Sequence, residues 1–404
     1  MSPVQVRPAA LFGFDPMHLT KEEERILEGE EGEAPAKAME LLLALGKVYD
    51  ADRLIPIESA QIAGVSYKTM GDAGLEFVSD FGKKEGAEVK VRSMLNPAGM
   101  DLKKKGYEPA EFREKQNELI EAYQKMGIEL SCTCTPYLAG NRPKKDENLA
   151  WSESSAVSFA NAVLGARTNR EGGPSALMAA IIGKTPHYGL HIKKNRRPDV
   201  IYEIEDQNVP PSLLGYLAGK DVGEKIPYFR GVDYSEDELK SLGAAMAATG
   251  SVAMYHVEAI TPEADDFSIE GLESIAIDEN AVKDVREELK SGLEPDVVVI
   301  GCPHLSGEEL KKVAKHLEGK KEKKEGPDLL VYTSRKVHEE FPEAVKTIER
   351  FGKVITDTCM VVSPLEERYE VAATNSGKAS AYLPKLAEQK VVYGDLKTLM
   401  EMVA

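Results

Sequence analysis

Short apolar runs alternate with charged, helix-like segments in the first and last thirds of this sequence. In the first third the apolar runs are RLIPIESAQIAGVSY, AEVKVRSMLNPAG and GIELSCTCTPY, and helix-like segments near residues 68–83 and 108–126 separate them. This alternation predicts mostly parallel sheets with helices on both faces. We therefore expect an α/β protein whose site lies beyond the carboxyl ends of the strands, where connecting loops and helix N-termini gather.

The chain is long enough to divide into several domains. Its 404 residues exceed the roughly 100–200 residues of one domain. The runs DVVVIGCPH, DLLVYTSRK, KVITDTCMV and VAATNSGK repeat the alternation near the C-terminus, whereas Ala, Ser and Gly dominate residues 151–189 and favour buried helices. The predicted division is a tail at 1–16, an N-terminal α/β domain at 17–150, a central helical and α+β region at 151–285, and a C-terminal α/β domain at 286–404.

The acidic composition limits what the protein binds. A net charge of −17 repels the phosphate backbone of nucleic acids and anionic membrane surfaces. No run approaches the ~18 uninterrupted apolar residues of a membrane span, and the N-terminus lacks the pattern of a signal peptide. Four cysteines are too few for a disulfide framework in a chain of this size. We expect a cytoplasmic protein that binds neither nucleic acid nor membrane, with thiols kept reduced and free for metal.

Three cysteines, Cys134, Cys302 and Cys359, each follow an apolar run that is typical of a strand. They lie 302 − 134 = 168 and 359 − 302 = 57 residues apart, so no local zinc-finger or ferredoxin spacing is present. Three thiolates carried to one sheet edge can hold an iron–sulfur cluster and leave one metal position open. Two alternatives remain: each cysteine is a small buried apolar residue, or Cys132 joins Cys134 in a zinc site or redox pair.

Two glycine-containing segments offer donors for an anion. TNSGKAS places Ser376 and Lys378 after an apolar run, but a P-loop needs glycine where this chain has Ala372, which argues against an ATPase. TNREGGPS places Arg170 ahead of an apolar helix, whose N-terminus attracts anions. Each segment can bind a carboxylate or phosphate, and for each the alternative is an ordinary turn.

Glu153 and His304 are candidates for catalysis. Glu153 lies among small and apolar residues, where a carboxylate needs a partner or a function. An ion pair with Arg170 is the structural alternative. His304 follows Cys302 by two residues, and its imidazole could orient a hydroxyl leaving group.

Eight segments together resemble one known family. They are GVSYKTMGDAG, MLNPAGMD, CTCTPYLAGNRP, WSESSAV, GARTNREGGPSAL, IGCPH, TDTCMV and TNSGKASAY. From Met17 to Ala404 the chain is similar to the aconitase X family, and most of all to its archaeal type. The resemblance implies an aconitase-like α/β catalytic subunit of a hydro-lyase. This chain lacks the further domain that is fused in bacterial members, which implies a separate small subunit.

The resemblance also implies a reaction and a cofactor. The archaeal type dehydrates (R)-mevalonate 5-phosphate to trans-anhydromevalonate 5-phosphate in the isoprenoid (mevalonate) pathway, and fused members act on cis-3-hydroxyproline. The cofactor is an iron–sulfur cluster, 4Fe–4S in the active form and also isolated as 3Fe–4S, which acts as a Lewis acid. The main base, a serine, is expected on the small swivelling-domain subunit. A dehydratase of another hydroxy acid and a non-catalytic iron–sulfur protein are the alternatives.

Matched residue by residue, the motifs of the family assign the site. The resemblance gives Cys134, Cys302 and Cys359 as cluster ligands. Cys134 is preferred to Cys132 because the fused members have a similar stretch, TC-x-PY, at residues 133–137. The expected substrate contacts are Gly64, Val65, Ser66, Asn96, Pro97, Glu153, Ser154, Ser376 and Lys378, to which the residue pattern adds Arg170. Glu153 and His304 are the expected catalytic residues of this chain.

Overall fold

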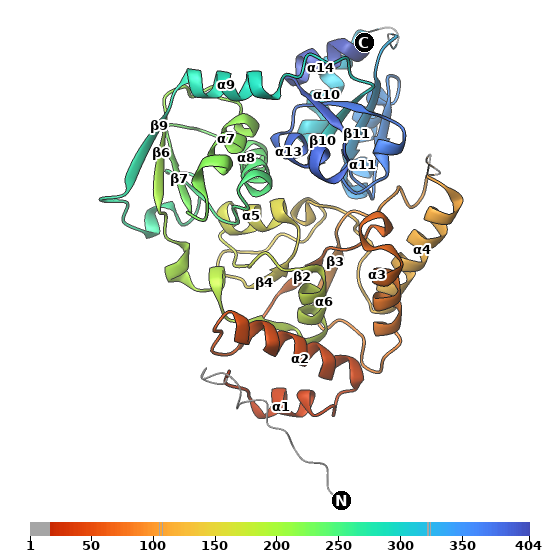
Figure 1. Ribbon diagram of the computed structural model, residues 1–404, viewed down its shortest axis with the longest axis vertical. Helices are drawn as coiled ribbons and strands as arrows, with labels where there is room; N and C mark the ends of the chain where they lie inside the picture. Colours follow the sequence, from red (N-terminus) through yellow and green to blue (C-terminus); the bar gives the residue numbers. More distant parts are fainter. Residues whose placement is uncertain (1–16, 105, 107, 321–322, 324) are drawn as a thin grey trace, which may run out of the picture.

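Three α/β parts follow one another along the chain (Figure 1). The computed structural model describes residues 17–104, 106, 108–320, 323 and 325–404, so the predicted tail at 1–16 lies outside the described residues. We call residues 17–186 the N-terminal part, 200–289 the middle part and 297–404 the C-terminal part. In Figure 1 they lie at the bottom, the upper left and the upper right.

The N-terminal part holds a three-stranded parallel sheet in the order β3-β2-β4, and β1 pairs with β5 in a separate antiparallel ribbon. Helix α1 begins at a capping box between Thr20 and Glu23, which satisfies backbone N–H groups that the helix leaves free. The elements are α1 (Lys21–Leu27), α2 (Glu33–Val48), β1 (Leu54–Pro56), β2 (Ser59–Ile62), α3 (Tyr67–Phe81), β3 (Arg92–Leu95), α4 (Ala110–Lys125), η2 (Pro136–Leu138), β4 (Leu149–Trp151), α5 (Ser154–Ala162), α6 (Gly173–Ile182) and β5 (Lys184–Pro186).

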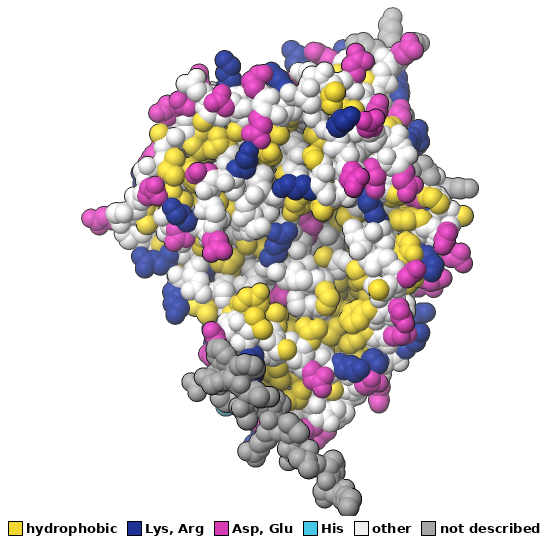
Figure 2. All heavy atoms as spheres, in the orientation of Figure 1, with side chains coloured by type: hydrophobic (Ala, Val, Ile, Leu, Met, Phe, Trp, Pro, Cys, Tyr) yellow, Lys and Arg dark blue, Asp and Glu magenta, His cyan; other side chains and the backbone are white. Residues whose placement is uncertain are grey.

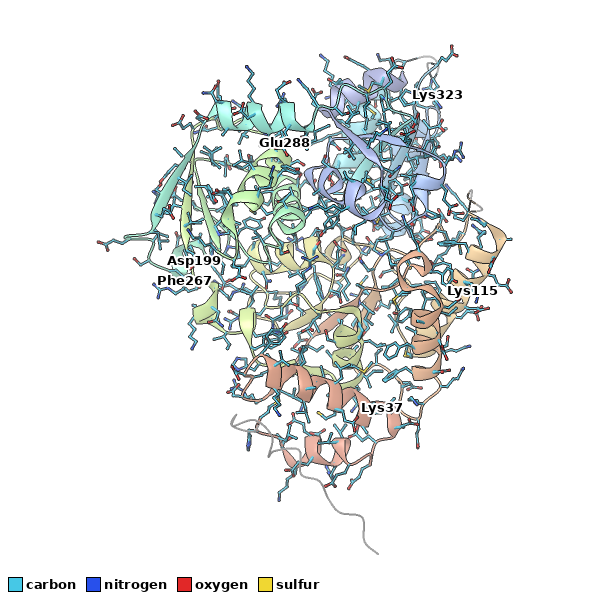
Figure 3. The ribbon with its side chains drawn as sticks, viewed as in Figure 1. Lys37, Lys115, Asp199, Phe267, Glu288 and Lys323 are labelled. Carbon is cyan, nitrogen blue, oxygen red and sulfur yellow. The ribbon has the colours of Figure 1, made fainter. Side chains whose placement is uncertain are left out.

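The middle part holds a four-stranded parallel sheet in the order β8-β7-β6-β9, with α7 and α8 packed together beside it (Figure 1). The short helices η3 (Gly189–His191) and η4 (Lys193–Arg196) lead into it. Its elements are β6 (Val200–Ile204), α7 (Pro211–Val222), β7 (Pro227–Arg230), α8 (Glu236–Thr249), β8 (His256–Val257), η5 (Ala264–Asp266), β9 (Glu273–Ile277) and α9 (Glu279–Leu289). On the outer side Lys220 of α7 binds Glu288 of α9 at 2.8 Å (Figure 3).

The C-terminal part holds a five-stranded parallel sheet in the order β12-β11-β10-β13-β14. Its central strand β10 begins with a continuous apolar run, as expected for a strand that is covered on both faces. The elements are β10 (Val297–Leu305), α10 (Gly307–Leu317), β11 (Asp328–Thr333), α11 (Arg335–Glu340), α12 (Pro342–Ile348), β12 (Lys353–Ile355), η6 (Leu365–Glu367), β13 (Val371–Thr374), α13 (Gly377–Leu386), β14 (Lys390–Tyr393) and α14 (Leu396–Val403).

Helix α8 joins the three parts. It packs against α5 of the N-terminal part, α7 of its own part and α13 of the C-terminal part. Glycines make the close approach possible, because a Cβ added at Gly215 of α7 would meet Leu242 O at 2.3 Å and one at Gly243 would meet Ser158 Oγ at 2.8 Å. Every residue of α5 is buried, which confirms the prediction of buried helices in residues 151–189. The three parts therefore share one packed centre.

The prediction of a strand before Cys134 is wrong. Apart from an isolated bridge between Glu129 and Met94, the run has no strand pairing. Backbone bonds still join it to β3, from Glu129 N to Ser93 O at 2.8 Å and from Thr133 N to Leu95 O at 3.0 Å, but Cys132 between them takes a φ of +41°. A positive φ lies outside the extended region that a strand requires, and Gln61 Nε2 adds a bond to Thr133 O at 3.0 Å. The segment is consequently a loop pinned to the sheet rather than a further strand of it.

The outer surface mixes charges of both signs. Figure 2 shows acidic and basic side chains intermingled on this face rather than separated by sign. Many of them pair, as Lys115 of α4 does with Asp72 of α3 at 3.0 Å (Figure 3). None of the helices in the described ranges is both long and apolar enough for a membrane span.

Candidate active site

Candidate residues from two parallel sheets meet between the N-terminal and C-terminal parts. In the N-terminal part, the loops that follow β2, β3 and β4 carry Gly64, Asn96 and Glu153. In the C-terminal part, β10 carries Cys302 near its carboxyl end and the loop after β13 carries Ser376. Parallel strands bring the loops at their carboxyl ends to one edge. The hydrogen bonds described below join these two edges.

Gln116 of α4 holds the loop that follows β2. Its Nε2 donates to Val65 O at 2.7 Å, and its Oε1 accepts from Tyr67 N and Gly99 N, both at 2.9 Å. Gly64 has a φ of +80°, where a side chain would strain the backbone. Gln116 is fully buried, so bonds from the protein interior hold the loop in place without a ligand.

Ser66 and Lys68 join this loop to the segment that carries Cys359. Ser66 Oγ donates to Val362 O at 2.7 Å, and Lys68 Nζ donates to Ser363 O at 3.0 Å. The predicted substrate loop thus lies against the loop of a predicted cluster ligand, although about 300 residues separate them in sequence.

Asn96, Glu153 and Lys378 form a connected polar group across the boundary. Asn96 Nδ2 donates to Glu153 Oε2 at 3.1 Å, and Lys378 Nζ donates to Glu153 Oε1. Burial by itself raises the pKa of Glu153, but the Lys378 ammonium group, together with hydrogen bonds from Asn96 and Ser155 N, outweighs it and lowers that pKa to about 2. Glu153 is therefore ionised at neutral pH. Pro97, which follows Asn96 in the sequence, is buried.

The alternative ion pair between Glu153 and Arg170 is wrong. Exposed Arg170 instead donates from Nη2 to Tyr382 Oη at 3.4 Å, and Tyr382 Oη lies 3.5 Å from Ser154 Oγ. Lys378 Nζ lies 5.7 Å from the ring centroid of Tyr382, within reach of a cation–π contact. Tyr382 was not predicted from the sequence. The signal for it is its spacing of 382 − 378 = 4 from Lys378, which places both side chains on one face of a helix.

Ser376 begins α13 and contacts the strand of Cys302. Its Oγ accepts from Ala379 N at 3.1 Å, the usual bond of a serine at a helix start. The same hydroxyl donates to Cys302 O. The start of α13, which also carries Lys378, is thereby held beside this cysteine.

The three cysteines of the expected ligand set come from separate segments. Cys302 lies inside β10 where its register with β11 shifts, Cys134 lies in the loop before η2, and Cys359 lies 359 − 355 = 4 residues after β12. Burial raises the pKa of Cys302 to about 12, against a lowering effect of Lys378 and with a further rise from Cys359. Burial also raises the pKa of Cys134, and Cys359 adds to that rise. Hydrogen bonds show how these segments meet, since His304 N donates to Cys134 Sγ at 3.2 Å and His304 Nε2 lies 2.8 Å from Thr358 O, beside Cys359.

His304 is fully buried, and both of its ring nitrogens have protein partners. Nδ1 lies 2.9 Å from Thr133 Oγ1, and Nε2 lies 2.8 Å from Thr358 O. Burial lowers the pKa of His304 to about 4, so the ring is neutral. Neither nitrogen is left for a substrate hydroxyl in this arrangement, and the catalytic role of His304 stays a prediction.

Free thiols are the donor type that an iron–sulfur cluster requires. Among the residues that the structure describes, no three His, Cys, Asp or Glu side chains lie close enough to hold one ion. In a cluster each cysteine binds a different iron, so the sulfurs stand farther apart than the ligands of one ion. Cys134, Cys302 and Cys359 stay the predicted ligands, and metal binding would deprotonate their thiols. Cys132, by contrast, is fully buried in the hydrophobic core of the N-terminal part.

The chain matches the three domains of a known family along almost its whole length. Residues 16–194 match the aconitase X first domain, residues 198–287 the second domain and residues 295–404 the third domain. The domain boundaries predicted at residues 150 and 285 stay a prediction.

Relatives of known sequence and structure agree with this match. The phosphomevalonate dehydratase large subunits of Methanosarcina mazei and Methanocaldococcus jannaschii are 53% and 50% identical, over 94% and 95% of this chain and 96% and 100% of theirs. The crystal structure of Thermococcus kodakaraensis aconitase X in its holo-form is 48% identical, with a TM-score of 0.89 over 96% of this chain and 100% of that one. The predicted aconitase-like fold is therefore confirmed, and the chain belongs to the aconitase X family.

Proposed function

We propose that this chain is the catalytic large subunit of a hydro-lyase that dehydrates (R)-mevalonate 5-phosphate to trans-anhydromevalonate 5-phosphate in an isoprenoid (mevalonate) pathway. The observation that carries the proposal is that hydrogen bonds bring the segments of Cys134, Cys302 and Cys359 to one boundary, where the Glu153–Lys378 pair also lies. Relatives at about half identity over nearly their full length bear the name of this large subunit. All four cysteines are free, as in the cytoplasm, where we place the enzyme.

Cys134, Cys302 and Cys359 are the residues that would hold an iron–sulfur cluster, 4Fe–4S in the active form and 3Fe–4S after loss of the labile iron. When bound, such a cluster supplies a Lewis acid that makes hydroxide a better leaving group. Cys302 and Cys359 are only partly buried, so a substrate can approach from their side. The non-catalytic alternative needs a fourth protein ligand, for which Cys132 is the candidate.

The side chains around the thiols suit a substrate with a carboxylate and a phosphate. Lys378 brings an ammonium group to the site, and the ionised Glu153 keeps it oriented. Arg170 stands at the exposed edge, where its guanidinium can meet a phosphate in the paired geometry that such anions favour. The remaining contacts fall to loop 64–66, Asn96, Pro97, Ser154 and Ser376, which lie around the same boundary.

Neither of the two residues predicted to be catalytic in this chain is an effective base for the proton-abstraction step. A carboxylate whose pKa is about 2, as in Glu153, is a weak base at neutral pH. His304 uses both ring nitrogens in bonds to protein. A serine of a small swivelling-domain subunit, the partner of this chain, is the base that we propose.

Substrate comparison on the assembled enzyme tests this function. The complex of both subunits, purified without oxygen, is assayed with mevalonate 5-phosphate, unphosphorylated mevalonate and cis-3-hydroxyproline. We expect turnover of the first alone, and Arg170→Gln should raise KM for it with little effect on kcat, because the lost contact binds phosphate and not the reacting atoms. Preferential turnover of cis-3-hydroxyproline would assign the alternative substrate. A cluster without turnover of any hydroxy acid would favour the non-catalytic protein.

A further inference from the structure

One buried imidazole touches all three cysteine segments. His304 lies two residues after Cys302 in β10. Its ring bonds Thr133 on one side, the residue before Cys134, and Thr358 on the other side, the residue before Cys359. His304 is thus two residues from one expected ligand, Cys302. It bonds the residues that come directly before the other two.

The direction of each bond follows from the chemistry of the partners. Thr358 O can only accept, so His304 Nε2 carries the hydrogen and donates it. Nδ1 of the neutral ring then accepts from the hydroxyl of Thr133. The backbone N–H of His304 donates to Cys134 Sγ at 3.2 Å, which adds a direct bond to one sulfur. The two ring bonds reach the residues before Cys134 and Cys359, and the N–H bond reaches Cys134 itself.

The backbone of His304 is itself fixed from the middle part. Lys240 of α8 donates to His304 O at 3.4 Å and pairs with Asp237 and Glu309. Its side chain is 2% exposed, so this support is anchored inside the packed centre. The backbone that carries the ring is therefore held independently of the loops that carry Thr133 and Thr358.

We infer that His304 is a positioning residue, which sets the spacing of the thiols of Cys134, Cys302 and Cys359 through its bonds to Thr133, Thr358 and Cys134. The inference rests on the proposed function, because the thiols need a fixed spacing only if they hold a cluster together. Partners of this kind orient metal ligands in many sites, and their loss typically weakens metal binding by about 10–100-fold. A histidine that served only the core would affect the stability of the fold and not the cluster.

Cluster retention tests the inference without relying on activity. Both subunits are assembled with the cluster reconstituted, and the release of iron to a chelator is timed for wild type, His304→Ala and His304→Gln, together with the electron paramagnetic resonance spectrum of each. We expect His304→Ala to release iron about 10–100-fold faster and to show an altered spectrum. His304→Gln should recover much of the retention, because its amide can donate to Thr358 O and accept from Thr133.

Two further pairs keep the test falsifiable if His304→Ala fails to fold. Thr133→Val removes only the hydroxyl that bonds Nδ1, and Thr133→Ser preserves it, so faster iron release is expected from the valine variant alone. His256→Ala removes another fully buried histidine, which bonds Arg196 O at 2.7 Å in the middle part. It should lower the unfolding temperature with unchanged iron release.

The outcomes separate this inference from the proposed function. Wild-type retention and spectrum in His304→Ala, or in Thr133→Val, would overturn the positioning role and leave the cluster assignment intact. Equal acceleration in His256→Ala would also overturn it, since the effect would then follow from lost fold stability. A wild-type complex that takes up no iron would overturn both.

Discussion

The ammonium group of Lys378 lies against the carboxylate of Glu153, and the two side chains are only 6% and 14% exposed. They come from α13 and from the residue that begins α5, so one ion pair ties the C-terminal part to the N-terminal part. Removing one member leaves the other charge buried and unpaired, which costs about 3–5 kcal/mol.

We predict from this pair that Lys378→Met and Glu153→Gln each lower the free energy of unfolding by about 3–5 kcal/mol, and that the double variant loses much less than their sum. Denaturant unfolding of the cluster-free chain measures all three values. Losses that simply add would show that the two groups do not act as a pair.

The two neighbouring cysteines are predicted to differ in iron binding. Cys132 packs in the core and takes a φ of +41°, whereas Cys134 accepts a bond from His304 N and lies near Cys359. Cys134→Ser should abolish iron uptake, and Cys132→Ser should keep the iron and sulfide content of wild type at a modest cost in stability. Loss of iron in Cys132→Ser with retention in Cys134→Ser would reverse the ligand assignment.

Gln116 is predicted to control substrate affinity without touching substrate. Gln116→Leu removes three bonds to the loops around Val65 and Gly99, and misplaced contacts should raise KM by about tenfold or more. Gln124→Leu, on an exposed position of the same helix, is the matched control. The measurement is KM for mevalonate 5-phosphate, determined by steady-state kinetics on the complex of each variant with the small subunit. An unchanged KM in Gln116→Leu, with iron content retained, would show that the loop keeps its place by other means.

Buried neutral histidines are predicted to make the chain acid-sensitive. Burial lowers the pKa of His191 to about 3, with smaller contributions from His187, Arg196 and Arg167. The unfolded chain binds a proton on this histidine below about pH 6.5 and the folded chain does not, so its contribution to stability is present above pH 6.5 and is lost as the pH falls towards 3.

One such histidine accounts for about 1.4 kcal/mol of unfolding free energy per pH unit within that window. Unfolding of the cluster-free chain between pH 6 and pH 4 should therefore depend less steeply on pH in His191→Gln than in wild type. Equal slopes for the two proteins would mean that His191 is protonated in the folded state.

The sequence predicts the parts of the fold that periodicity governs. Strands β2 and β3 and the loops at Gly64 and Asn96 follow from alternation and turn residues. The loop at Cys134 does not, because the positive φ of Cys132 interrupts an otherwise strand-like run. Contacts between the N-terminal and C-terminal parts are harder to predict from the sequence. Glu153 and Lys378 lie 225 residues apart, and no local pattern fixes such a pairing.

The sequence predicted which residues belong to the site but not the contacts between them. Residue type and family resemblance named Ser376 and Lys378, but the bond from Ser376 to Cys302 O depends on how two sheets pack. Tyr382 escaped notice because a single tyrosine on a helix has no signature of its own. Its place in the site is visible from its contacts with Arg170 and Ser154 of the N-terminal part.

The most direct test of the account is one sample in which cluster and chemistry are measured together. This chain is purified without oxygen, alone and with its small subunit, and iron, acid-labile sulfide and dehydration of mevalonate 5-phosphate are determined. We predict iron and sulfide in both samples, turnover in the complex and none in the chain alone. Absence of iron, or turnover by the chain alone at the rate of the complex, would contradict the account.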